Sequence, residues 1–247
     1  MGDRPRDVPP PGVSHERPPR MLSKAELCEQ WARAACGEDV VSACQASSAA
    51  DCRLTQAELC QSIAPDQLAT DGVDGCIAAV AAAYRDAELD ADELNLVLRF
   101  SGACARTIVG PNAAGADCVS PRDCDLSRGY TCVVKGEGSG SCQVPELVEP
   151  GRSCTEAAQT CSDGFFCDGS HCVETLAEGE PCILHSQCAA DGYCNDAGAC
   201  AARLAVNEPC ESDEWCARGV CTDLDGQRVC TDRVILSRAD PLCANLR

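Results

Sequence analysis

The sequence predicts small disulfide-rich repeats, short β-hairpin modules preceded by an α-helical cysteine-rich domain. Cysteine supplies 24 of 247 residues and aromatic residues only 3%, so large side chains cannot fill a wide core and disulfides must replace it. Sixteen of the cysteines fall into four similar groups of four. The seven before them lie in a segment with helix-capping signals.

Disulfides explain these cysteines better than metal binding does. Structural zinc and iron–sulfur sites favour two cysteines separated by two residues. The closest pairs here, Cys167/Cys172 and Cys216/Cys221, have four residues between them, and the same spacing excludes a thioredoxin-type motif. We therefore expect no metal and no cofactor, and an oxidising compartment in which disulfides persist.

Residues 22–110 are predicted to form the α-helical cysteine-rich domain. Ser23 and Glu26 form a capping box, and Leu22 can pack on Leu27. The pattern recurs 32 residues later at Thr55 and Glu58, which favours an internal duplication; ordinary helix-forming sequence is the alternative. The cysteines of this domain are Cys28, Cys36, Cys44, Cys52, Cys60, Cys76 and Cys104.

Two further helices are expected in this domain. Cys76 to Tyr84 is rich in alanine, the strongest helix former. Asp90 can cap a helix that runs through Cys104. Its apolar face is formed by Leu94, Val97, Leu98 and Phe100.

Four modules are predicted at 111–150, 151–178, 179–206 and 207–247, the last with a C-terminal tail. Each opens at a turn-prone stretch, and turn residues lie between its third and fourth cysteines, which indicates one β-hairpin per module. In the first module the turn signal is Gly136 to Gly140. The sixteen cysteines are Cys118, Cys124, Cys132, Cys142; Cys154, Cys161, Cys167, Cys172; Cys182, Cys188, Cys194, Cys200; and Cys210, Cys216, Cys221, Cys230.

Four cysteines allow three pairings. We favour first with third and second with fourth, because interleaved bridges hold both arms of the hairpin. Each bridge that closes a loop of about 15 residues stabilises a module by roughly 3 kcal/mol on chain-entropy grounds. Cys243 is left over, and we expect it to pair with a cysteine of the helical domain; an intermolecular disulfide is the alternative.

Residues 1–21 are rich in Pro and Arg and are predicted to be a disordered tail. They lack the apolar run of a signal peptide, which leaves a wrongly assigned start, a removed signal or an unusual export route. We favour the first, because the cysteine content indicates the extracellular space or the cell envelope. No apolar stretch is long enough for a transmembrane helix, and a net charge of −19 argues against nucleic acid and anionic membranes.

One stretch has a family-like cysteine spacing, Cys182-x5-Cys188-x4-Tyr193-Cys194 and then Cys210-x5-Cys216-x4-Cys221. It resembles the Dickkopf N-terminal cysteine-rich domain, although the adjacent Cys-Cys pair of that family is absent. The resemblance spans residues 182–221 and implies an extracellular disulfide module; the family's known members are secreted antagonists that bind cell-surface co-receptors. The whole layout is also similar to uncharacterised cysteine-rich envelope proteins of bacteria.

Signals of catalysis are weak. The histidines are His15 in the tail and His171 and His185 inside modules; we interpret His185 as a solvated loop residue. Oxidised cysteines leave no thiolate nucleophile, and no Gly-x-Ser-x-Gly elbow occurs. The stretch 136–140 lacks the Lys and helix of a phosphate loop. The acidic run 86–93 is interpreted as helix capping and solvation, with weak calcium binding as the alternative.

We therefore expect a non-catalytic, extracellular binding or structural protein that presents rigid modules to a protein or glycan at the cell surface. Aromatic side chains often anchor interfaces; the candidates are Tyr130, Phe165, Phe166, Tyr193 and Trp215. The alternative is that each ring covers its own disulfide. A protease inhibitor with a disulfide-locked loop and, less favoured, a hydrolytic enzyme with a polar pocket are the other functional hypotheses.

Overall fold

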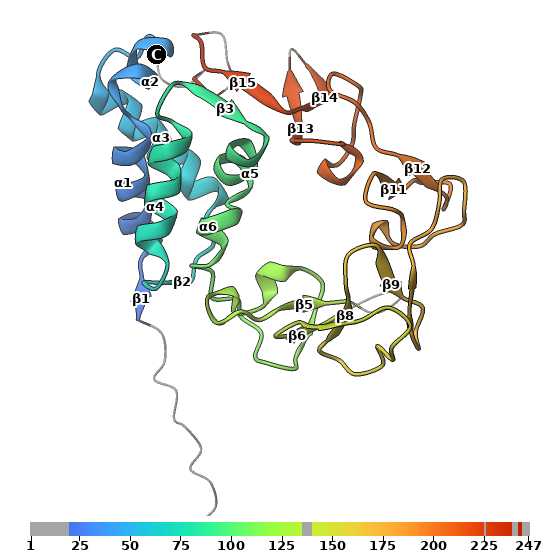
Figure 1. Ribbon diagram of the computed structural model, residues 1–247. Coiled ribbons are helices and arrows are strands. Elements are labelled where there is room, and N and C mark those ends of the chain that lie inside the picture. Colours follow the sequence, from blue (N-terminus) through green and yellow to red (C-terminus); the bar gives the residue numbers. More distant parts are fainter. Residues whose placement is uncertain (1–19, 135–139, 225, 239–241, 244–247) are drawn as a thin grey trace, which may run out of the picture.

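The computed structural model describes residues 20–134, 140–224, 226–238 and 242–243. The helices are α1 (Lys24–Ala35), α2 (Glu38–Ala43), α3 (Ala49–Ile63), α4 (Val73–Ala83), α5 (Ala91–Arg99) and α6 (Gly102–Ala105). The short 3-10 turns are η1 (Pro121–Asp123), η2 (Leu126–Arg128), η3 (His185–Gln187) and η4 (Asp213–Trp215). This order confirms a helical domain followed by small modules (Figure 1).

All strands are short. They are β1 (Met21–Leu22), β2 (Leu68–Ala69), β3 (Glu88–Asp90), β4 (Asp117–Cys118), β5 (Thr131–Val133), β6 (Gly140–Gln143), β7 (Glu146–Val148), β8 (Gln159–Cys161), β9 (Phe165–Cys167), β10 (Cys172–Glu174), β11 (Gly192–Cys194), β12 (Cys200–Ala202), β13 (Val220–Leu224), β14 (Gln227–Thr231) and β15 (Arg233–Ile235). Four antiparallel pairs, β5–β6, β9–β10, β11–β12 and β13–β14, confirm one hairpin per module. The predicted turn at 136–139 and residues 1–19 of the tail predicted at 1–21 lie outside the described residues. Met21, the last residue of that predicted tail, lies in β1 and pairs with Ala69 of β2.

The helical domain begins with the predicted capping box. The Ser23 hydroxyl accepts from the Glu26 N–H at 3.2 Å, and the Glu26 carboxylate accepts from the Ser23 N–H at 3.1 Å. Helix α1 packs against α3 and α4, and it buries Leu27 and Trp31 completely. The Trp31 ring stacks on Phe100 with centroids 6.0 Å apart, so this core is built around large buried aromatic side chains.

The second capping box, predicted at Thr55 and Glu58, is wrong. Both residues lie inside α3, which starts earlier, at the N-cap Ser48. The Ser48 hydroxyl accepts from the Asp51 N–H at 3.1 Å, so an upstream cap was available and the helix runs through the repeated motif. The duplicated sequence pattern therefore has no duplicated capping role.

The helix predicted from Asp90 through Cys104 is interrupted. Asp90 caps α5, as expected, and Glu93 completes a capping box with it. Helix α5 ends at Arg99, because its C-cap Phe100 has a left-handed φ of 52°. This turn directs the Phe100 ring into the core, where it is 1% exposed. A new short helix, α6, then carries Cys104 to its disulfide with Cys76.

All 24 cysteines lie in the described residues and none is free. The helical domain contains Cys28–Cys60, Cys36–Cys52 and Cys76–Cys104. Each module has the first–third and second–fourth pairing: Cys118–Cys132, Cys124–Cys142, Cys154–Cys167, Cys161–Cys172, Cys182–Cys194, Cys188–Cys200, Cys210–Cys221 and Cys216–Cys230. Cys243 pairs with Cys44, so both parts of the predicted connectivity are confirmed.

The modules repeat at the level of single hydrogen bonds. The N–H of the opening residue, Gly115, Gly151, Gly179 or Asn207, donates to the carbonyl of the module's fourth cysteine at 2.8 Å. All four opening residues have positive φ, and Asn207 replaces glycine in the last module at +70°, a substitution that asparagine tolerates. The four units therefore share one backbone design despite their different cysteine spacings.

The run of modules is closed at both ends on the helical domain. Module 1 is attached through the Ser127 N–H, which donates to the Ile108 carbonyl at 3.0 Å. Module 4 is followed by β15, which pairs with β3, and Val220 and Val234 belong to the helical core. In Figure 1 the modules form an arc that leaves the helical domain near α6 and returns to it at β3.

Candidate functional site

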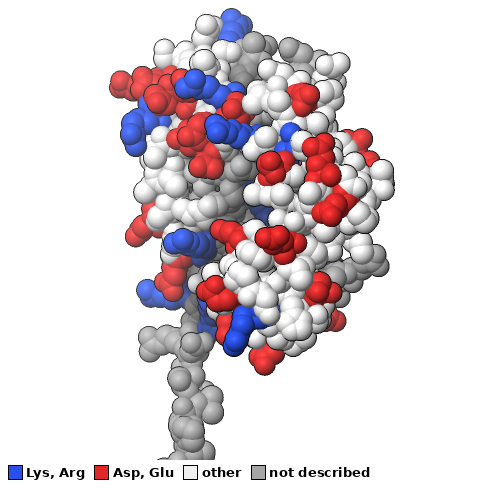
Figure 2. All heavy atoms as spheres, turned by 45° about the vertical axis from the view of Figure 1, so that its right-hand side comes forward, with Lys and Arg blue, Asp and Glu red and all other residues white. Residues whose placement is uncertain are grey.

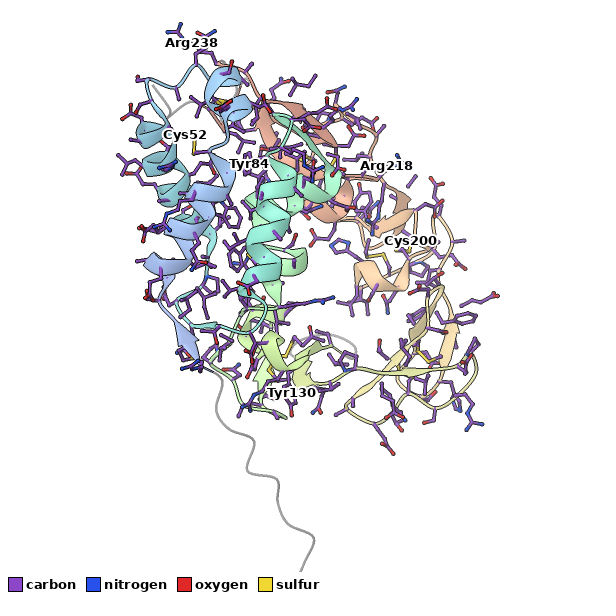
Figure 3. All side chains as sticks on the ribbon, turned by 60° about the vertical axis from the view of Figure 1, so that its left-hand side comes forward. Cys52, Tyr84, Tyr130, Cys200, Arg218 and Arg238 are labelled. Atoms are coloured by element: carbon purple, nitrogen blue, oxygen red, sulfur yellow. A yellow bond between two sulfur atoms is a disulfide. The ribbon has the colours of Figure 1, made fainter. Side chains whose placement is uncertain are left out.

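Tyr130 and Phe165 belong to different modules and do not form a common site. Tyr130 is half-buried and packs on the cystine cluster of module 1, so its ring covers its own disulfides. Figure 3 shows it at one end of the arc, away from Cys200 in module 3. Phe165 is half-buried on β9, opposite Glu174 of β10. Partner contact at these rings stays a prediction.

Tyr193 and Trp215 are brought together. Their rings stack across the junction of modules 3 and 4, with centroids 5.3 Å apart. Tyr193 is 8% exposed, so its ring is buried at this junction, and partner contact there stays a prediction. The physical reason is module packing: the junction offers an aromatic face, and stacking there removes the ring from water.

The position of Trp215 explains why module 4 differs from its neighbours. The residue before the second cysteine is Asp123 in module 1 and Gln187 in module 3, and each caps the backbone after the first cysteine. Asp123 Oδ2 accepts from the Val119 N–H at 2.8 Å, and Gln187 Oε1 accepts from the Ile183 N–H at 2.7 Å. Trp215 cannot accept such a bond, and it packs on module 3 instead.

His185 is more constrained than a solvated loop residue, so that interpretation is corrected. Its Nδ1 accepts from the Cys194 N–H at 3.1 Å, and its ring lies 6.3 Å from that of Tyr193. Asp213 has the same role in module 4, where Oδ1 accepts from the Cys221 N–H at 2.8 Å. Each side chain holds the strand that carries the third cysteine of its module.

Asp213 also binds the helical domain. Arg99, the last residue of α5, donates Nε to Oδ2 at 2.7 Å and Nη2 to Oδ1 at 3.1 Å. Burial raises the pKa of Asp213. The hydrogen bonds from Arg99 and from the Cys221 N–H lower this pKa by a larger amount, so the net shift is downward. The bond to Asp213 raises the pKa of Arg99. This two-bond ion pair holds module 4 on the helical domain.

Arg122 plays the matching part for module 1. Its Nη1 donates to the Ile63 carbonyl at 3.2 Å and its Nη2 to the Arg99 carbonyl. Ile63 and Arg99 are the last residues of α3 and α5, where unpaired carbonyls concentrate partial negative charge. One guanidinium therefore caps two helices. Sequence reasoning missed Arg99, Arg122 and Asp213 because nothing in the local sequence indicates these long-range partners.

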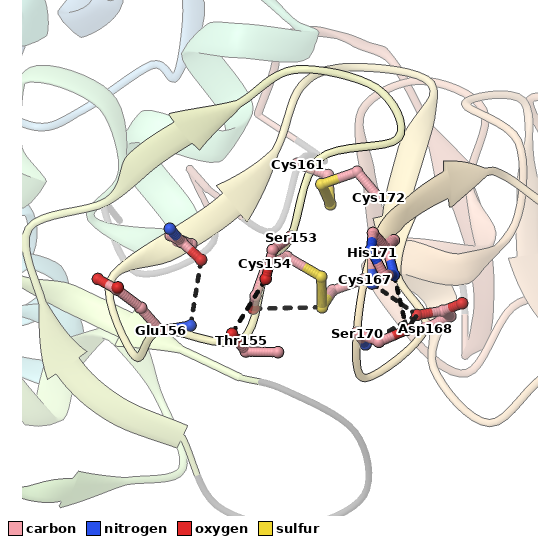
Figure 4. The surroundings of a disulfide bond; sticks show 11 residues. Ser153, Cys154, Thr155, Glu156, Cys161, Cys167, Asp168, Ser170, His171 and Cys172 are labelled. Atoms are coloured by element: carbon pink, nitrogen blue, oxygen red, sulfur yellow. Dashed lines mark hydrogen bonds between the residues drawn. A yellow bond between two sulfur atoms is a disulfide. The ribbon is translucent and has the colours of Figure 1, made fainter.

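Module 2 contains a Ser, a His and an Asp in contact, but not as a catalytic triad (Figure 4). Asp168 Oδ1 accepts from the Ser170 hydroxyl at 2.8 Å, and His171 Nδ1 lies 3.0 Å from the same hydroxyl. In a triad the carboxylate orients the histidine, and the histidine takes the serine proton. Here the carboxylate itself receives that proton in a hydrogen bond, so the cluster is a stable turn.

Sulfur atoms gather in every module, but as disulfides. The first, second and fourth cysteines of each module place their sulfurs within 4.8 Å of one another, close enough for a metal if they were thiolates. All are oxidised in the described chain. Of the acidic run, Asp90 and Glu93 are used in the cap of α5, and Glu88 pairs with Arg233; the predicted capping role is confirmed for Asp90.

Three cavities bounded by described residues lie between units rather than within them. One of about 860 Å³ is bounded by the helical domain at Phe100 and Ile108, module 1 at Arg122 and module 4 at Asp213. Another, of about 510 Å³, lies between modules 2 and 3, with Phe166 and Ile183 on its walls. Ile183 was not among the predicted residues, although its place directly after a first cysteine, shared by Val119, was a signal.

No helix of the described chain is long and apolar enough to span a membrane. The twelve disulfides fit a protein of an oxidising compartment. Comparison with protein-family models, with curated proteins and with solved structures finds no match to this chain.

Proposed function

We propose that this protein is a non-catalytic extracellular or cell-envelope scaffold that binds a protein or glycan partner through the middle of its module arc. The observation that carries the proposal is the attachment of both ends of the arc. Module 1 is tied by Arg122 and module 4 by Asp213, β15 and Cys243. Modules 2 and 3 are therefore held between two fixed points.

Fixed geometry favours binding because it lowers the conformational entropy lost on association. The middle modules contain few large apolar side chains, so their own folding needs the disulfides. Their outward residues are free of that task and available for a partner. The resemblance of residues 182–221 to Dickkopf modules supports the same class of function, an extracellular module that contacts another molecule.

The test is a selection of ligands by the oxidised protein. Biotinylated protein is presented to a random-peptide display library and to a glycan array, beside a reduced and alkylated control. The scaffold proposal expects one reproducible ligand class that the control does not bind. Enrichment of nothing in either format, or equal binding by the alkylated control, would contradict it.

The absence of catalysis is a part of this proposal with its own test. The Asp168–Ser170–His171 turn is the arrangement closest to hydrolase chemistry in the described residues. We expect no turnover of generic ester, peptide or glycoside substrates. Turnover that disappears in a Ser170→Ala variant would overturn the absence of catalysis, and it would leave the proposed attachment of the module arc unaffected.

A second candidate, a protease inhibitor, is favoured by the loops between first and second cysteines. Val119 and Ile183 follow directly on disulfide-bonded cysteines, and their side chains are 81% and 59% exposed. Their N–H groups are held by Asp123 and Gln187, which makes the loops rigid. Inhibition of a protease panel that is lost in Val119→Gly or Ile183→Gly would establish this function in place of the scaffold.

A further inference from the structure

We propose that the cavity between modules 2 and 3 binds a cationic protein segment through one aliphatic side chain. The inference rests on the proposed scaffold function and names its partner. It depends on two features of the same two modules: an apolar cavity that they share, and exposed charged side chains that are almost all acidic.

The cavity has an apolar lining that the fold keeps in place. It is bounded by the Cys154–Cys167 disulfide and Phe166 from module 2, and by Ile183 from module 3. Ile183 is 59% exposed, and its N–H is fixed by Gln187 Oε1 at 2.7 Å. An exposed aliphatic side chain that cannot withdraw favours an apolar group from a partner.

The charge of modules 2 and 3 is one-sided. Residues 151–206 contain eight acidic side chains, two arginines and no lysine. The eight acidic residues are all exposed: Glu156, Asp163, Asp168, Glu174, Glu178, Glu180, Asp191 and Asp196. Of the arginines, Arg203 donates Nε inward to the Gly192 carbonyl at 3.0 Å. In Figure 2 acidic side chains are scattered among uncharged ones over the right-hand part of the molecule, with few basic side chains between them.

Asp168 joins the two features, because it lines the cavity and carries one of these charges. Its Oδ1 accepts from the Ser170 N–H and hydroxyl and from the His171 N–H, each at 2.8 Å. The His171 bond, followed by the Ser170 bonds, lowers the pKa of Asp168, so the carboxylate is charged at neutral pH. Within the described residues no donor contacts Oδ2, which is available for a lysine or arginine.

Several kinds of molecule could place an apolar group in this cavity, and the negative charge of modules 2 and 3 distinguishes among them. Negative partners, including anionic lipid and nucleic acid, are repelled by this surface. A neutral glycan gains nothing from the eight carboxylates. A basic segment is attracted over a distance of about one Debye length, roughly 8 Å at physiological salt, and its aliphatic side chain then adds short-range affinity in the cavity.

The test uses synthetic peptides and the full-length oxidised protein. The probe is a short Lys/Arg peptide with one central Leu, beside the same peptide with Ser at the centre and an acidic peptide with the Leu retained. Dissociation constants are measured by titration calorimetry at low and physiological salt. We expect binding of the Leu-containing basic peptide, roughly tenfold weaker binding with Ser, weakening by salt, and no binding of the acidic peptide.

The variants separate this site from general attraction of charge. Ile183→Ser and Asp168→Asn should each weaken the basic peptide roughly tenfold or less, since one apolar or one charged contact is lost. The matched controls are Val119→Ser, the equivalent position of module 1, and Asp223→Asn, which removes a carboxylate that accepts from the Gly226 N–H in the module 4 hairpin. Both should bind as the unchanged protein does.

Equal weakening by the controls, indifference to the central Leu, or no binding of the basic peptide would overturn the inference. The scaffold proposal is tested separately. If the display selection enriches peptides without basic residues, the scaffold stands and this partner is wrong. If the selection and the glycan array both enrich nothing, the scaffold fails before this site is considered.

Discussion

At the scale of single residues, the attachment of the arc depends on two arginines with different partners. Arg99 meets a carboxylate of module 4, whereas Arg122 meets two main-chain carbonyls at helix C-termini. The first interaction is an ion pair that titrates. The second places a guanidinium against two helix ends. Burial lowers the pKa of Arg122, but its carbonyl partners do not titrate, so acid leaves this attachment unchanged. The two attachments should therefore respond differently to pH.

Removal of Arg122 should loosen module 1 at every pH. Arg122→Ala leaves two helix C-termini without their donor, and we expect a loss of about 1–2 kcal/mol in the free energy of unfolding. Arg122→Lys should recover only part of it, because a single ammonium lacks the planar fork. Chemical denaturation measures both. Arg152→Ala, an exposed arginine of module 2, is the control with no expected change; an equal loss there would contradict the assignment.

The Arg99–Asp213 pair should contribute stability that depends on pH. The folded-state pKa of Asp213 is lowered, so this contribution is present above the ordinary aspartate pKa of about 4 and is lost as the pH falls through the lower folded value. For an exposed two-bond pair we expect about 1 kcal/mol. The measurement is the free energy of unfolding of Asp213→Asn and the unchanged protein from acid to neutral pH. A difference that persists when Asp213 is protonated would contradict the pair.

At the scale of elements, the hairpins depend on glycines for two different reasons. Gly219 in module 4 has a φ of +76°, and a Cβ there would lie 1.9 Å from the Thr231 carbonyl oxygen. Gly164 in module 2 has a φ of +83°, but a Cβ would meet nothing within 4 Å. The two glycines have the same backbone conformation, but only Gly219 lies where a Cβ would clash with a neighbouring strand.

Alanine substitution should separate these two causes. Gly164→Ala should cost about 1–2 kcal/mol, the strain of a left-handed alanine. Gly219→Ala adds a clash with backbone, and we expect a total of about 3 kcal/mol or more, together with slower formation of Cys210–Cys221. Thermal unfolding and the yield of correctly oxidised protein are the measurements. Equal costs at the two positions would show that module 4 does not close on β14 as described.

The stacked pair Tyr193–Trp215 belongs to this scale because it joins two modules. A double-mutant cycle with Leu at each position should give a coupling free energy of about 1 kcal/mol. Hydrogen exchange at the Leu204 amide, which donates to the Trp215 carbonyl at 2.7 Å, reports the junction directly. Tyr130→Leu combined with Trp215→Leu is the distant control and should show no coupling. Additive effects for Tyr193 and Trp215 would mean that modules 3 and 4 do not pack.

Local sequence was a good guide wherever the interactions are local. The Ser23 capping box, the Asp90 cap and the four hairpins followed from residues within a few positions of each other. The cap predicted at Thr55 was wrong because α3 already begins at the earlier cap Ser48. The continuous helix predicted through Phe100 was wrong because packing of this ring in the core ends α5 there. Cysteine parity could predict that Cys243 returns to the helical domain, but not that Val220 and β15 return with it.

The candidate site was less predictable for the same physical reason. Tyr193 and Trp215 were candidate partner anchors, with covering of their own disulfides as the alternative. Their stacking on each other depends on how two modules meet, which no local pattern encodes. Ile183 borders a cavity that exists only between modules. Charge is the exception: the acidic character of residues 151–206 is visible in the sequence alone, because nearly all charged side chains face solvent.

At the scale of the whole molecule, one disulfide closes the arc covalently. Cys44 and Cys243 are 199 residues apart, and on chain-entropy grounds such a bridge is worth at most about 5 kcal/mol. It works beside the β3–β15 pairing and the burial of Val220 and Val234. The Cys44→Ser/Cys243→Ser variant should keep module 4 docked but lower the unfolding midpoint. Rapid proteolysis within 232–238 in the unchanged protein would contradict this arrangement.

The most direct test of the account is disulfide mapping of the native protein by mass spectrometry without reductant. We expect no free thiol, one peptide pair joining Cys44 to Cys243, and first–third with second–fourth linkage in every module. Free thiols in folded protein, or a module with its first cysteine bound to its second, would contradict the attachment of the module arc at both ends and the scaffold function that depends on it.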